Sequence, residues 1–459
     1  MSLYSSLCSR VLFPLHERLK GHDSVSRRQL LDQSQWWSPE QLNAYRLKRL
    51  KEFLTHIGQK VPYYQQMFER IRFDVHAIRS MSGLEALPLL TKSDIRENVE
   101  HFKAHGHGEL SRYNTGGSSG VPLVFYMGKG RKSHDVAAKW RATRWWGVDI
   151  GDTELVVWGS PIELGAQDRL RRLRDGVMRS HLLPAFEMSV KNLDRFVQTI
   201  CSTRPKMLFG YPSSLSLIAQ HARKKGVAMD ALGIKVAFVT SERLYDEQRA
   251  VIAEVFGCPV ANGYGARDAG FIAHECPSGS MHISVEDIVV ETVRPDGSAT
   301  SPNEIGEIVV THMATGDFPF VRYRTGDVGM LGDQPCACGR GLPVLKEIQG
   351  RTTDFVVAQN GTVMHGLALI YTLRDLPGVK QFRVEQLSVG ETVVKLVVTE
   401  EFERASEIRI VQDFKARLGE SVTIRIEKVQ EIANEASGKF RYVVSHVKVF
   451  EGAAGAAHA

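Results

Sequence analysis

The chain has 459 residues, of which 43% are hydrophobic and 24% are charged, a composition typical of soluble globular proteins. This length exceeds what one hydrophobic core usually organises, so two or three domains are expected. The 58 basic and 52 acidic residues leave a net charge of only +6. Lys and Arg are nowhere concentrated among aromatic residues, so nucleic acid is not an expected partner.

No apolar run approaches the roughly 18–20 residues that span a bilayer, so no transmembrane segment is expected. The first 20 residues carry apolar side chains at helical spacing: Leu3, Leu7, Val11, Leu15 and Leu19. This pattern predicts a helix that packs on the body of the protein and not on a membrane. Six cysteines in a chain of this length do not form a disulfide framework, which favours a reducing cytoplasm.

Residues 24–80 have a polar, helical pattern. Ser38, followed by Pro39, predicts a helix start, because Ser is a favoured cap and Pro suits the first turn. Thr91 and Asp94 have the spacing of a second cap with its reciprocal partner. The basic segment 169–174 is expected to be the solvated face of a helix.

Helical and strand patterns alternate between residues 131 and 260. Strands are predicted at 154–159, 207–210 and 236–240, and helices at 189–200, 213–225 and 247–256. This alternation predicts α/β layers with a partly parallel sheet, and a strand-rich part follows at 283–330. The expected fold class is therefore α/β, with a large multi-layer N-terminal domain.

The pattern changes beyond Gly350. Asn360-Gly361 predicts a hairpin with a type I′ turn within 355–364. A helix at 367–376, strands at 379–386, 392–399 and 422–428, and a helix with Ile408, Val411, Phe414 and Leu418 facing inward complete the segment. We expect a large domain at 1–349, a small mobile α+β domain at 350–450 joined by a hinge, and a disordered tail at 451–459.

One segment consists only of Gly, Ser and Thr: Thr115, Gly116, Gly117, Ser118, Ser119 and Gly120. With little side-chain bulk, its N–H groups and hydroxyls can converge on an anion, which suits a polyphosphate. Taken alone, the segment fits a flexible connector equally well. It lacks the Lys-Ser/Thr ending of a Walker loop, and the Gly263-x-Gly265 pair lacks the third glycine of a dinucleotide fingerprint.

Four further motifs follow this loop in order: Tyr264-Gly265-Ala266-Arg267-Asp268, Arg322-Tyr323-Arg324-Thr325-Gly326-Asp327, Gly350-Arg351-Thr352-Thr353-Asp354 and Ser437-Gly438-Lys439. In this order and spacing the chain resembles the adenylate-forming superfamily of acyl-activating enzymes. Within it, the chain is most similar to phenylacetate–CoA ligases and to relatives encoded with capsular polysaccharide genes. The resemblance covers residues 30 to 450.

The resemblance implies an ATP site. The 115–120 loop would hold the β- and γ-phosphates, and Tyr264, next to Gly265, would stack on adenine. Asp327 would accept hydrogen bonds from both ribose hydroxyls, for which a carboxylate is well suited. Arg351 would reach the ribose or the phosphates, or else form an interdomain salt bridge.

The resemblance also implies residues that bind Mg²⁺, stabilise negative charge or form the hinge between the domains. Asp268 stands where the family has an acidic residue, usually Glu, that helps to bind Mg²⁺. Lys439 would reach from the small domain and stabilise charge that develops on the α-phosphate and the carboxylate. Thr353 and Asp354 mark the hinge, where the family commonly has Asp or Lys at the pivot. Because Thr353 departs from this pattern, transfer to coenzyme A is less firmly predicted than adenylation.

Four candidate zinc ligands lie outside these motifs: Cys276, His282, Cys336 and Cys338. Their number suits a tetrahedral site, although the spacing is not that of a standard zinc finger. Relatives in this branch are similar in carrying a structural metal, which would join two loops. The alternative interpretation is separate buried thiols and a surface histidine.

The expected function is ATP-dependent activation of a small carboxylic acid to an acyl-adenylate, with release of pyrophosphate and transfer to coenzyme A. The first alternative is an adenylating enzyme of polysaccharide or secondary-metabolite biosynthesis with a non-CoA acceptor. The second is a zinc-containing binding protein with a degenerate nucleotide site. The cofactors expected are ATP with Mg²⁺, coenzyme A as co-substrate and structural Zn²⁺, and dimers among relatives imply a homodimer.

Overall fold

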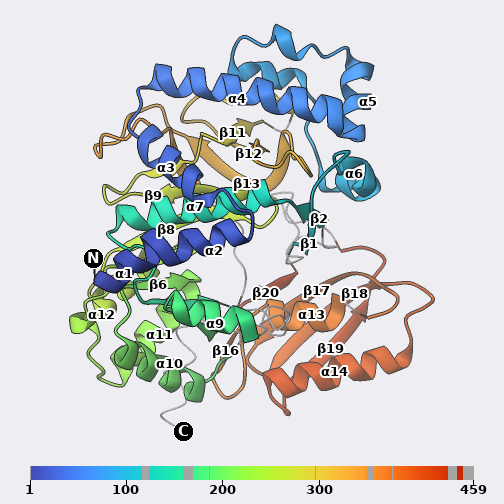
Figure 1. Ribbon diagram of the computed structural model, residues 1–459. Helices are drawn as coiled ribbons and strands as arrows, with labels where there is room; N and C mark the ends of the chain where they lie inside the picture. Colours follow the sequence, from blue (N-terminus) through green and yellow to red (C-terminus); the bar gives the residue numbers. More distant parts are fainter. Residues whose placement is uncertain are drawn as a thin grey trace.

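The computed structural model describes residues 2–115, 123–158, 169–185, 187–294, 296–348, 355–374, 376–432 and 442–447. A large sheet-rich N-terminal part and a separate C-terminal domain are visible in Figure 1, where the C-terminal domain is orange to red. Within these ranges, no helix combines the length and the apolar character needed to cross a membrane.

A mixed sheet forms the centre of the large part. In the described residues it has eleven strands in the order β11-β12-β13-β14-β10-β9-β8-β7-β6-β3-β4. The strands are β3 (Glu154–Trp158), β4 (Ser180–Pro184), β6 (Met207–Gly210), β7 (Val236–Thr240), β8 (Val260–Ala266), β9 (Gly270–Glu275), β10 (Met281–Ile283), β11 (Ile288–Val293), β12 (Ile305–His312), β13 (Tyr323–Leu331) and β14 (Val344–Ile348). Neighbours from β4 to β8 are parallel, and those from β8 to β11 are antiparallel. The expected α/β class with a partly parallel sheet is confirmed.

Helices connect the parallel strands, as the alternating pattern predicted. They are α9 (Arg169–Val177), α10 (Val190–Thr203), α11 (Pro212–Lys224) and α12 (Asp246–Phe256), with a 3-10 turn at Asp230–Leu232, and α7 (Lys129–Trp145) precedes the first parallel strand. Helix α10 begins after Ser189, whose side chain accepts a hydrogen bond from the Asn192 N–H. Its expected apolar residues Leu193, Phe196, Val197 and Ile200 are buried, so this helix contributes its predicted face to the core.

The N-terminal helices pack on the large part, the first of them beside residues 152 and 177 near the parallel strands and later ones on the antiparallel strands. They are α1 (Leu3–Leu7), a π-helical segment (Cys8–Leu12), α2 (Phe13–Leu19), α3 (Ser24–Ser34), α4 (Pro39–Lys60), α5 (Pro62–Ile71) and α6 (Lys92–Glu97). Short 3-10 turns cover Val75–Ala77, Met81–Ala86 and Val99–Phe102, and β1 (Ser111–Asn114) pairs with β2 (Val124–Met127). The capping boxes at Ser38 and Thr91 both form, the latter with Asp94 as expected.

The predicted packing of the first helix is wrong in its orientation. The segment does lie against the body, but through Ser5, Cys8, Phe13 and Glu17, which are all buried. Its five regularly spaced apolar residues are exposed instead. Small and polar residues can approach the body closely here because Ser5 donates to Asp152 and Glu17 accepts from Ser24, which satisfies their polar groups.

The C-terminal domain packs helices α13 (Leu367–Arg374) and α14 (Arg404–Leu418) on a sheet. The sheet order is β19 (Thr423–Lys428), β18 (Glu391–Val398), β17 (Val379–Ser388) and β20 (Val443–Ser445). A further hairpin, β15 (Phe355–Val357) and β16 (Val363–His365), pairs with β5 (Glu187–Met188) of the large part. The expected boundary at residue 349 and the tail at 451–459 lie outside the described residues, so the domain limits stay predictions.

Two details of this domain differ from expectation. Ile408 is exposed, and Ile410 is buried with Phe414 and Leu418, so the inward face of α14 is rotated from the predicted one. The hairpin at Asn360-Gly361 forms, but with a three-residue loop instead of a type I′ turn. Asn360 does not have positive φ, because its side chain accepts from the Thr362 N–H and only Gly361 enters the left-handed region.

Candidate functional site

The base of the Gly/Ser/Thr loop is held by a hairpin. Strands β1 and β2 pair up to Asn114 and Val124. Beyond them the Thr115 N–H donates to the Leu123 carbonyl, and the Leu123 N–H donates to Thr115 Oγ1, each at 3.0 Å. The two ends of the loop are therefore fixed at one place. Residues Gly116 to Gly120 lie outside the described residues.

The second motif lies where β8 turns into β9. Tyr264 and Gly265 are at the end of β8, where the pairing with β9 is irregular. A Cβ added at Gly265 would lie 2.3 Å from the Gly270 carbonyl oxygen, which is closer than any real side chain approaches. Gly265 is thus needed for the tight return of the chain that presents Arg267 and Asp268.

Tyr264 contacts the residue expected to bind ribose. Its hydroxyl donates to Asp327 Oδ2 at 3.0 Å, and the Asp327 N–H donates to Thr325 Oγ1 at 3.1 Å. Burial, with a further contribution from the Asp327 charge, holds the pKa of Tyr264 well above its usual value. Tyr264 therefore remains a protonated donor at neutral pH and orients a half-buried carboxylate.

Asp268 is buried and is hydrogen-bonded by the hydroxyl of Tyr323. The main chain around it is held by Arg131 of α7, which donates to the carbonyls of Arg267 at 3.2 Å and of Asp268 at 3.3 Å. Neither Arg131 nor the role of Tyr323 was predicted from the sequence. Tyr323 lies inside the Arg322–Asp327 motif, whereas no pattern in the sequence distinguishes Arg131 from other helical arginines.

A further contact joins the first two motifs. Arg267 Nη1 lies 3.4 Å from the carbonyl oxygen of Asn114 at the base of the loop. The structure therefore brings together Thr115, Tyr264, Gly265, Asp268 and Asp327 from three separate motifs. Arg351, Thr353, Asp354 and Lys439 lie outside the described residues, so their positions relative to this site stay predictions.

A buried polar cluster lies behind Arg131. His134, Asp135 and His312 each offer one metal-ligating atom within 4.8 Å of the others. However, the Arg131 guanidinium already pairs with the Asp135 carboxylate at 2.9 Å, and this positive charge opposes a second cation. Burial, more than any other effect, lowers the pKa of His312 to about 3, so it is neutral. We interpret the cluster as the support that holds Arg131 against the 267–268 main chain.

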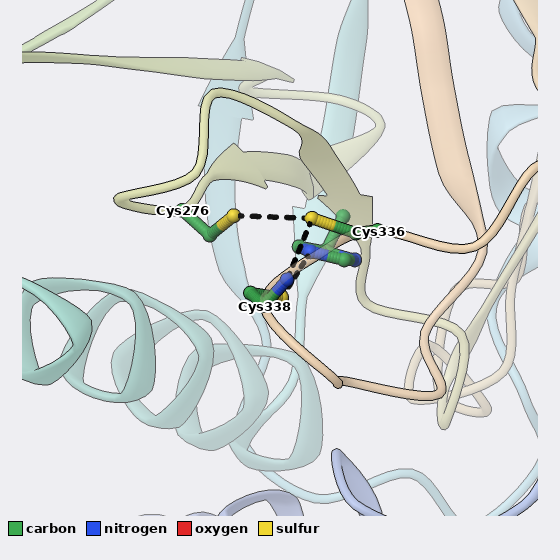
Figure 2. Close-up of side chains that lie close together, drawn as sticks. Cys276, Cys336 and Cys338 are labelled. Carbon is green, nitrogen blue, oxygen red and sulfur yellow. Dashed lines mark hydrogen bonds between the residues drawn. The ribbon is translucent and has the colours of Figure 1, made fainter.

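The four predicted zinc ligands do lie together. Cys276 follows β9, His282 is in β10, and Cys336 and Cys338 lie in the connection between β13 and β14. Their ligand atoms are all within 4.8 Å of one another. Figure 2 shows the three cysteines converging from these two connections. The alternative of separate buried thiols and a surface histidine is wrong, since His282 is fully buried within the cluster.

The distances suit a tetrahedral metal. The sulfurs of Cys276 and Cys336 are 3.7 Å apart, far longer than a disulfide. Two Zn–S bonds of about 2.3 Å at a tetrahedral angle would separate the sulfurs by about 3.8 Å. His282 donates from Nδ1 to the Leu342 carbonyl at 3.0 Å and directs Nε2 to Cys338 Sγ at 3.2 Å. The hydrogen bond from Nδ1 to the Leu342 carbonyl is the usual support of a metal-binding histidine, and it leaves Nε2 directed toward the sulfurs.

The chain is similar in sequence to protein CapK and to phenylacetate-coenzyme A ligases. Residues 356–446 match the CapK C-terminal domain. Protein CapK of Staphylococcus aureus is 24% identical over 405 residues, which cover 87% of this chain and 88% of CapK. The phenylacetate-coenzyme A ligase of Thermus thermophilus is 25% identical over 333 residues, covering 71% of this chain and 73% of that ligase.

Solved structures show the same fold. A 2-hydroxyisobutyryl-CoA ligase in complex with its acyl-AMP and CoA superposes with a TM-score of 0.64 and 18% identity, over 92% of this chain and 93% of that ligase. The same ligase in the postadenylation state gives a TM-score of 0.60 at 19% identity. These structures confirm the expected fold class. The resemblance predicted from five short motifs is confirmed by this fold together with the similarity to protein CapK and to the phenylacetate-coenzyme A ligase.

Proposed function

We propose that this homologue of phenylacetate–CoA ligases and protein CapK activates a small carboxylic acid with ATP, forming an acyl-adenylate and pyrophosphate. The acyl group then passes to the thiol of coenzyme A. The contact that carries the proposal is the hydrogen bond from Tyr264 to Asp327, since it joins two motifs that the superfamily uses for one nucleotide. The homology to acid–CoA ligases supports the second step.

The described residues have suitable chemistry for the first step. The Asp327 carboxylate, oriented by Tyr264, would accept hydrogen bonds from the ribose hydroxyls. The loop that starts at Thr115 would bind the β- and γ-phosphates through its N–H groups, because its ends are pinned beside Arg267. Asp268 offers carboxylate oxygen to Mg²⁺, which would neutralise phosphate charge when bound.

The remaining roles are proposed from the motifs. Lys439 would stabilise the negative charge that develops as the carboxylate oxygen attacks the α-phosphorus and pyrophosphate leaves. Arg351 would contact the ribose or the phosphates. Thr353 and Asp354 would form the hinge about which the small domain, residues 350–450, changes position between the two steps.

An acceptor other than coenzyme A is the second candidate. It is favoured by Thr353, which stands where the family commonly has Asp or Lys at the hinge pivot used in the second step. The two candidates share adenylation and differ in what attacks the acyl-adenylate. Product analysis with and without coenzyme A distinguishes them.

The test is acid-dependent exchange of labelled pyrophosphate into ATP, measured with a panel of aromatic, aliphatic and hydroxy acids. We expect exchange with at least one acid, and its loss in Lys439→Ala. Lys380→Ala, an exposed lysine of the same domain, is the matched control and should retain exchange. Absence of exchange across the panel by folded wild-type protein would contradict adenylation. Equal exchange in Lys439→Ala would contradict the role of that residue.

We further propose that Cys276, His282, Cys336 and Cys338 hold a structural Zn²⁺. Support comes from the Sγ–Sγ distance of 3.7 Å and from the oriented imidazole of His282. The ion would join the β9–β10 connection to the β13–β14 connection, and Asp327 lies on β13. Elemental analysis of purified protein should find one equivalent of zinc, and near absence of metal would contradict the proposal.

A further inference from the structure

The N-terminal helical segment is firmly attached to the body of the protein by one face. Cys8, Phe13 and Glu17 are buried against it, and the Tyr4 hydroxyl donates to the Val177 carbonyl at 2.7 Å. In Figure 1 the dark blue helices α1 and α2 run along the outside of the large part, with α9 beside them. This attachment fixes which face of the segment is directed outward.

The outward face is an unbroken line of apolar side chains, defined here as the N-terminal apolar stripe. It consists of Leu3, Leu7, Val11, Leu15 and Leu19, which are exposed by 93, 48, 52, 54 and 81%, respectively. Four residues of an α-helix advance about 40° beyond a full turn, so such a line would normally wind around the helix. The π-helical segment at Cys8–Leu12 has wider turns and reverses this drift. The backbone therefore keeps the stripe on one side.

The neighbouring helix adds exposed apolar surface. Leu173 and Val177 of α9, one turn apart, are exposed by 68 and 38%. Helix α9 is joined to the segment through the Tyr4–Val177 hydrogen bond and through contact between Cys8 Sγ and Met178 Sδ at 3.3 Å. Single exposed apolar side chains are common on proteins, whereas a continuous set on adjacent helices marks a binding surface.

Within residues 2–22 the exposed charges have one sign, and the acidic residues that flank the surface, Asp23 and Asp175, are paired with Arg27 and Arg174. Between residues 2 and 22 the only acidic side chain is Glu17, which is buried and accepts a hydrogen bond from Ser24. The exposed charged residues of this segment are Arg10, Arg18 and Lys20. An apolar face bordered by exposed cations is the composition of helices that lie in the interface of an anionic bilayer.

We propose that the N-terminal apolar stripe docks the protein on an anionic lipid surface. The leucine and valine side chains would enter the boundary between headgroups and acyl chains, while Arg10, Arg18 and Lys20 would contact lipid phosphates. The segment would lie parallel to the membrane plane because its buried face stays attached to the protein. This peripheral binding is separate from the proposed ligase activity and does not depend on it.

The experiment is sedimentation of the purified full-length protein with lipid vesicles. We expect binding to vesicles of equal phosphatidylglycerol and phosphatidylcholine, and binding at least about tenfold weaker to phosphatidylcholine alone. Added salt should weaken the binding because it screens the basic border. Failure to sediment with the anionic vesicles at low salt would overturn the proposal.

A triple variant tests the stripe itself. Leu7→Gln/Val11→Gln/Leu15→Gln should bind anionic vesicles at least about tenfold more weakly, since three apolar side chains are lost from the contact. The matched control changes three equally exposed residues on other surfaces, Val190→Gln/Ile305→Gln/Ile408→Gln, which are exposed by 54, 49 and 54%. The control should bind like wild type. Equal binding by the two triple variants would overturn the assignment of the stripe.

A charge variant tests the basic border. Arg10→Gln/Arg18→Gln/Lys20→Gln should lose both affinity and salt dependence. Lys48→Gln/Arg223→Gln/Lys225→Gln, with the same change in net charge and side chains exposed by 77, 55 and 51%, should lose little of either. Equal effects of the two charge variants would overturn the role of the border.

The oligomeric state shows whether the N-terminal apolar stripe binds lipid or a second copy of the chain. Light scattering should give the same mass for wild type and for the Leu7→Gln/Val11→Gln/Leu15→Gln variant. A dimer that this variant converts to a monomer would make the stripe a subunit interface and overturn the lipid proposal. Because the three side chains are exposed, the thermal midpoint of the variant should match that of wild type, which separates loss of binding from unfolding.

Discussion

Removing the Tyr264 hydroxyl tests the contact that carries the proposed nucleotide site. Tyr264→Phe keeps the buried ring and deletes only the donor to Asp327 Oδ2. A hydrogen bond to a charged group contributes about 1.5–3 kcal/mol, and the half-buried position of Asp327 favours the lower end. About 1.5 kcal/mol corresponds to about a tenfold change in an equilibrium constant. We therefore expect the KM for ATP to rise about tenfold.

The assay is pyrophosphate exchange at varied ATP with the best acid of the panel. Because Asp327 would hold the ribose in ground state and transition state alike, KM should rise while kcat stays nearly constant. Tyr64→Phe is the matched control, since its buried hydroxyl donates to Pro319 and accepts from Val321, each at 3.2 Å, inside the core. This control should lower stability without changing the KM for ATP.

A double-mutant cycle tests whether Tyr264 acts through Asp327. If Tyr264 acts by orienting Asp327, then Tyr264→Phe should add little to Asp327→Asn. An undiminished tenfold effect in the Asp327→Asn background would mean that the hydroxyl acts independently, and the coupling would be wrong. The raised pKa of Tyr264 keeps the phenol protonated, so the effect of Tyr264→Phe should not change between neutral and mildly alkaline solution.

Two further predictions concern the scaffold of the site. Cys336→Ser should release most of the bound zinc and lower the thermal midpoint, whereas Cys258→Ser, at a buried thiol outside the cluster, should retain full zinc content in elemental analysis. Gly265→Ala should cost about 1–3 kcal/mol, measured as a lower thermal midpoint, because its Cβ would overlap the Gly270 carbonyl. Gly176→Ala, with nothing within 4 Å of an added Cβ, should not destabilise the protein, and equal loss in both variants would contradict the steric argument.

Local signals were sufficient to predict much of the fold. Ser38 and Thr91 each combine a capping side chain with a reciprocal partner three residues later, so the helix starts are determined within a few residues of sequence. Helix α10 has both a cap at Ser189 and one apolar face, and its buried residues were predicted correctly. Strands β6 and β7 are short apolar runs between such helices, which leaves few alternatives for their position.

The spacing of apolar residues predicted the wrong buried face where contacts with distant segments determine which face is buried. The N-terminal segment buries Ser5 because Asp152, distant in sequence, accepts its hydrogen bond, and it buries Glu17 because His22 and Ser24 satisfy the carboxylate. A hydrophobic periodicity reveals neither set of polar contacts. In α14 the choice between Ile408 and Ile410 depends on the facing sheet. The turn at Asn360 differs from the predicted type because the Asn360 side chain accepts a hydrogen bond from the Thr362 N–H.

In the candidate site, too, local motifs were predicted from the sequence, whereas contacts between distant segments were not. Motif order predicted that Tyr264, Asp268 and Asp327 share a site, and chemical type predicted the zinc ligands. The residues that support them, Arg131 and Tyr323, act through main-chain carbonyls and a single buried hydroxyl. Such contacts are made across elements far apart in sequence, so a single sequence carries no pattern that reveals them.

The acid stability of the large part should depend on Asp287. This carboxylate is buried and pairs with Arg49 at 2.7 Å and Arg27 at 3.1 Å, which connects α3 and α4 to the sheet. Burial by itself would raise the pKa of Asp287, but the charges of His134, Arg49 and Arg27 outweigh it and lower the pKa from 3.8 to about 2. At about 1.4 kcal/mol per pKa unit, this shift corresponds to about 2 kcal/mol of stability.

The direction of the pH dependence of stability follows from the lowered pKa of Asp287. The stabilisation is fully present above the unfolded pKa of 3.8 and is lost as the pH falls through about 2. Asp287→Asn should therefore lower the thermal midpoint by a few degrees at neutral pH, and the difference from wild type should shrink as the pH falls below 3.8. Glu254→Gln, which alters an exposed pair with Arg223, should change the midpoint little at any pH. A difference between wild type and Asp287→Asn that stays constant down to a pH of about 2 would mean that the neighbouring positive charges do not hold this carboxylate ionised.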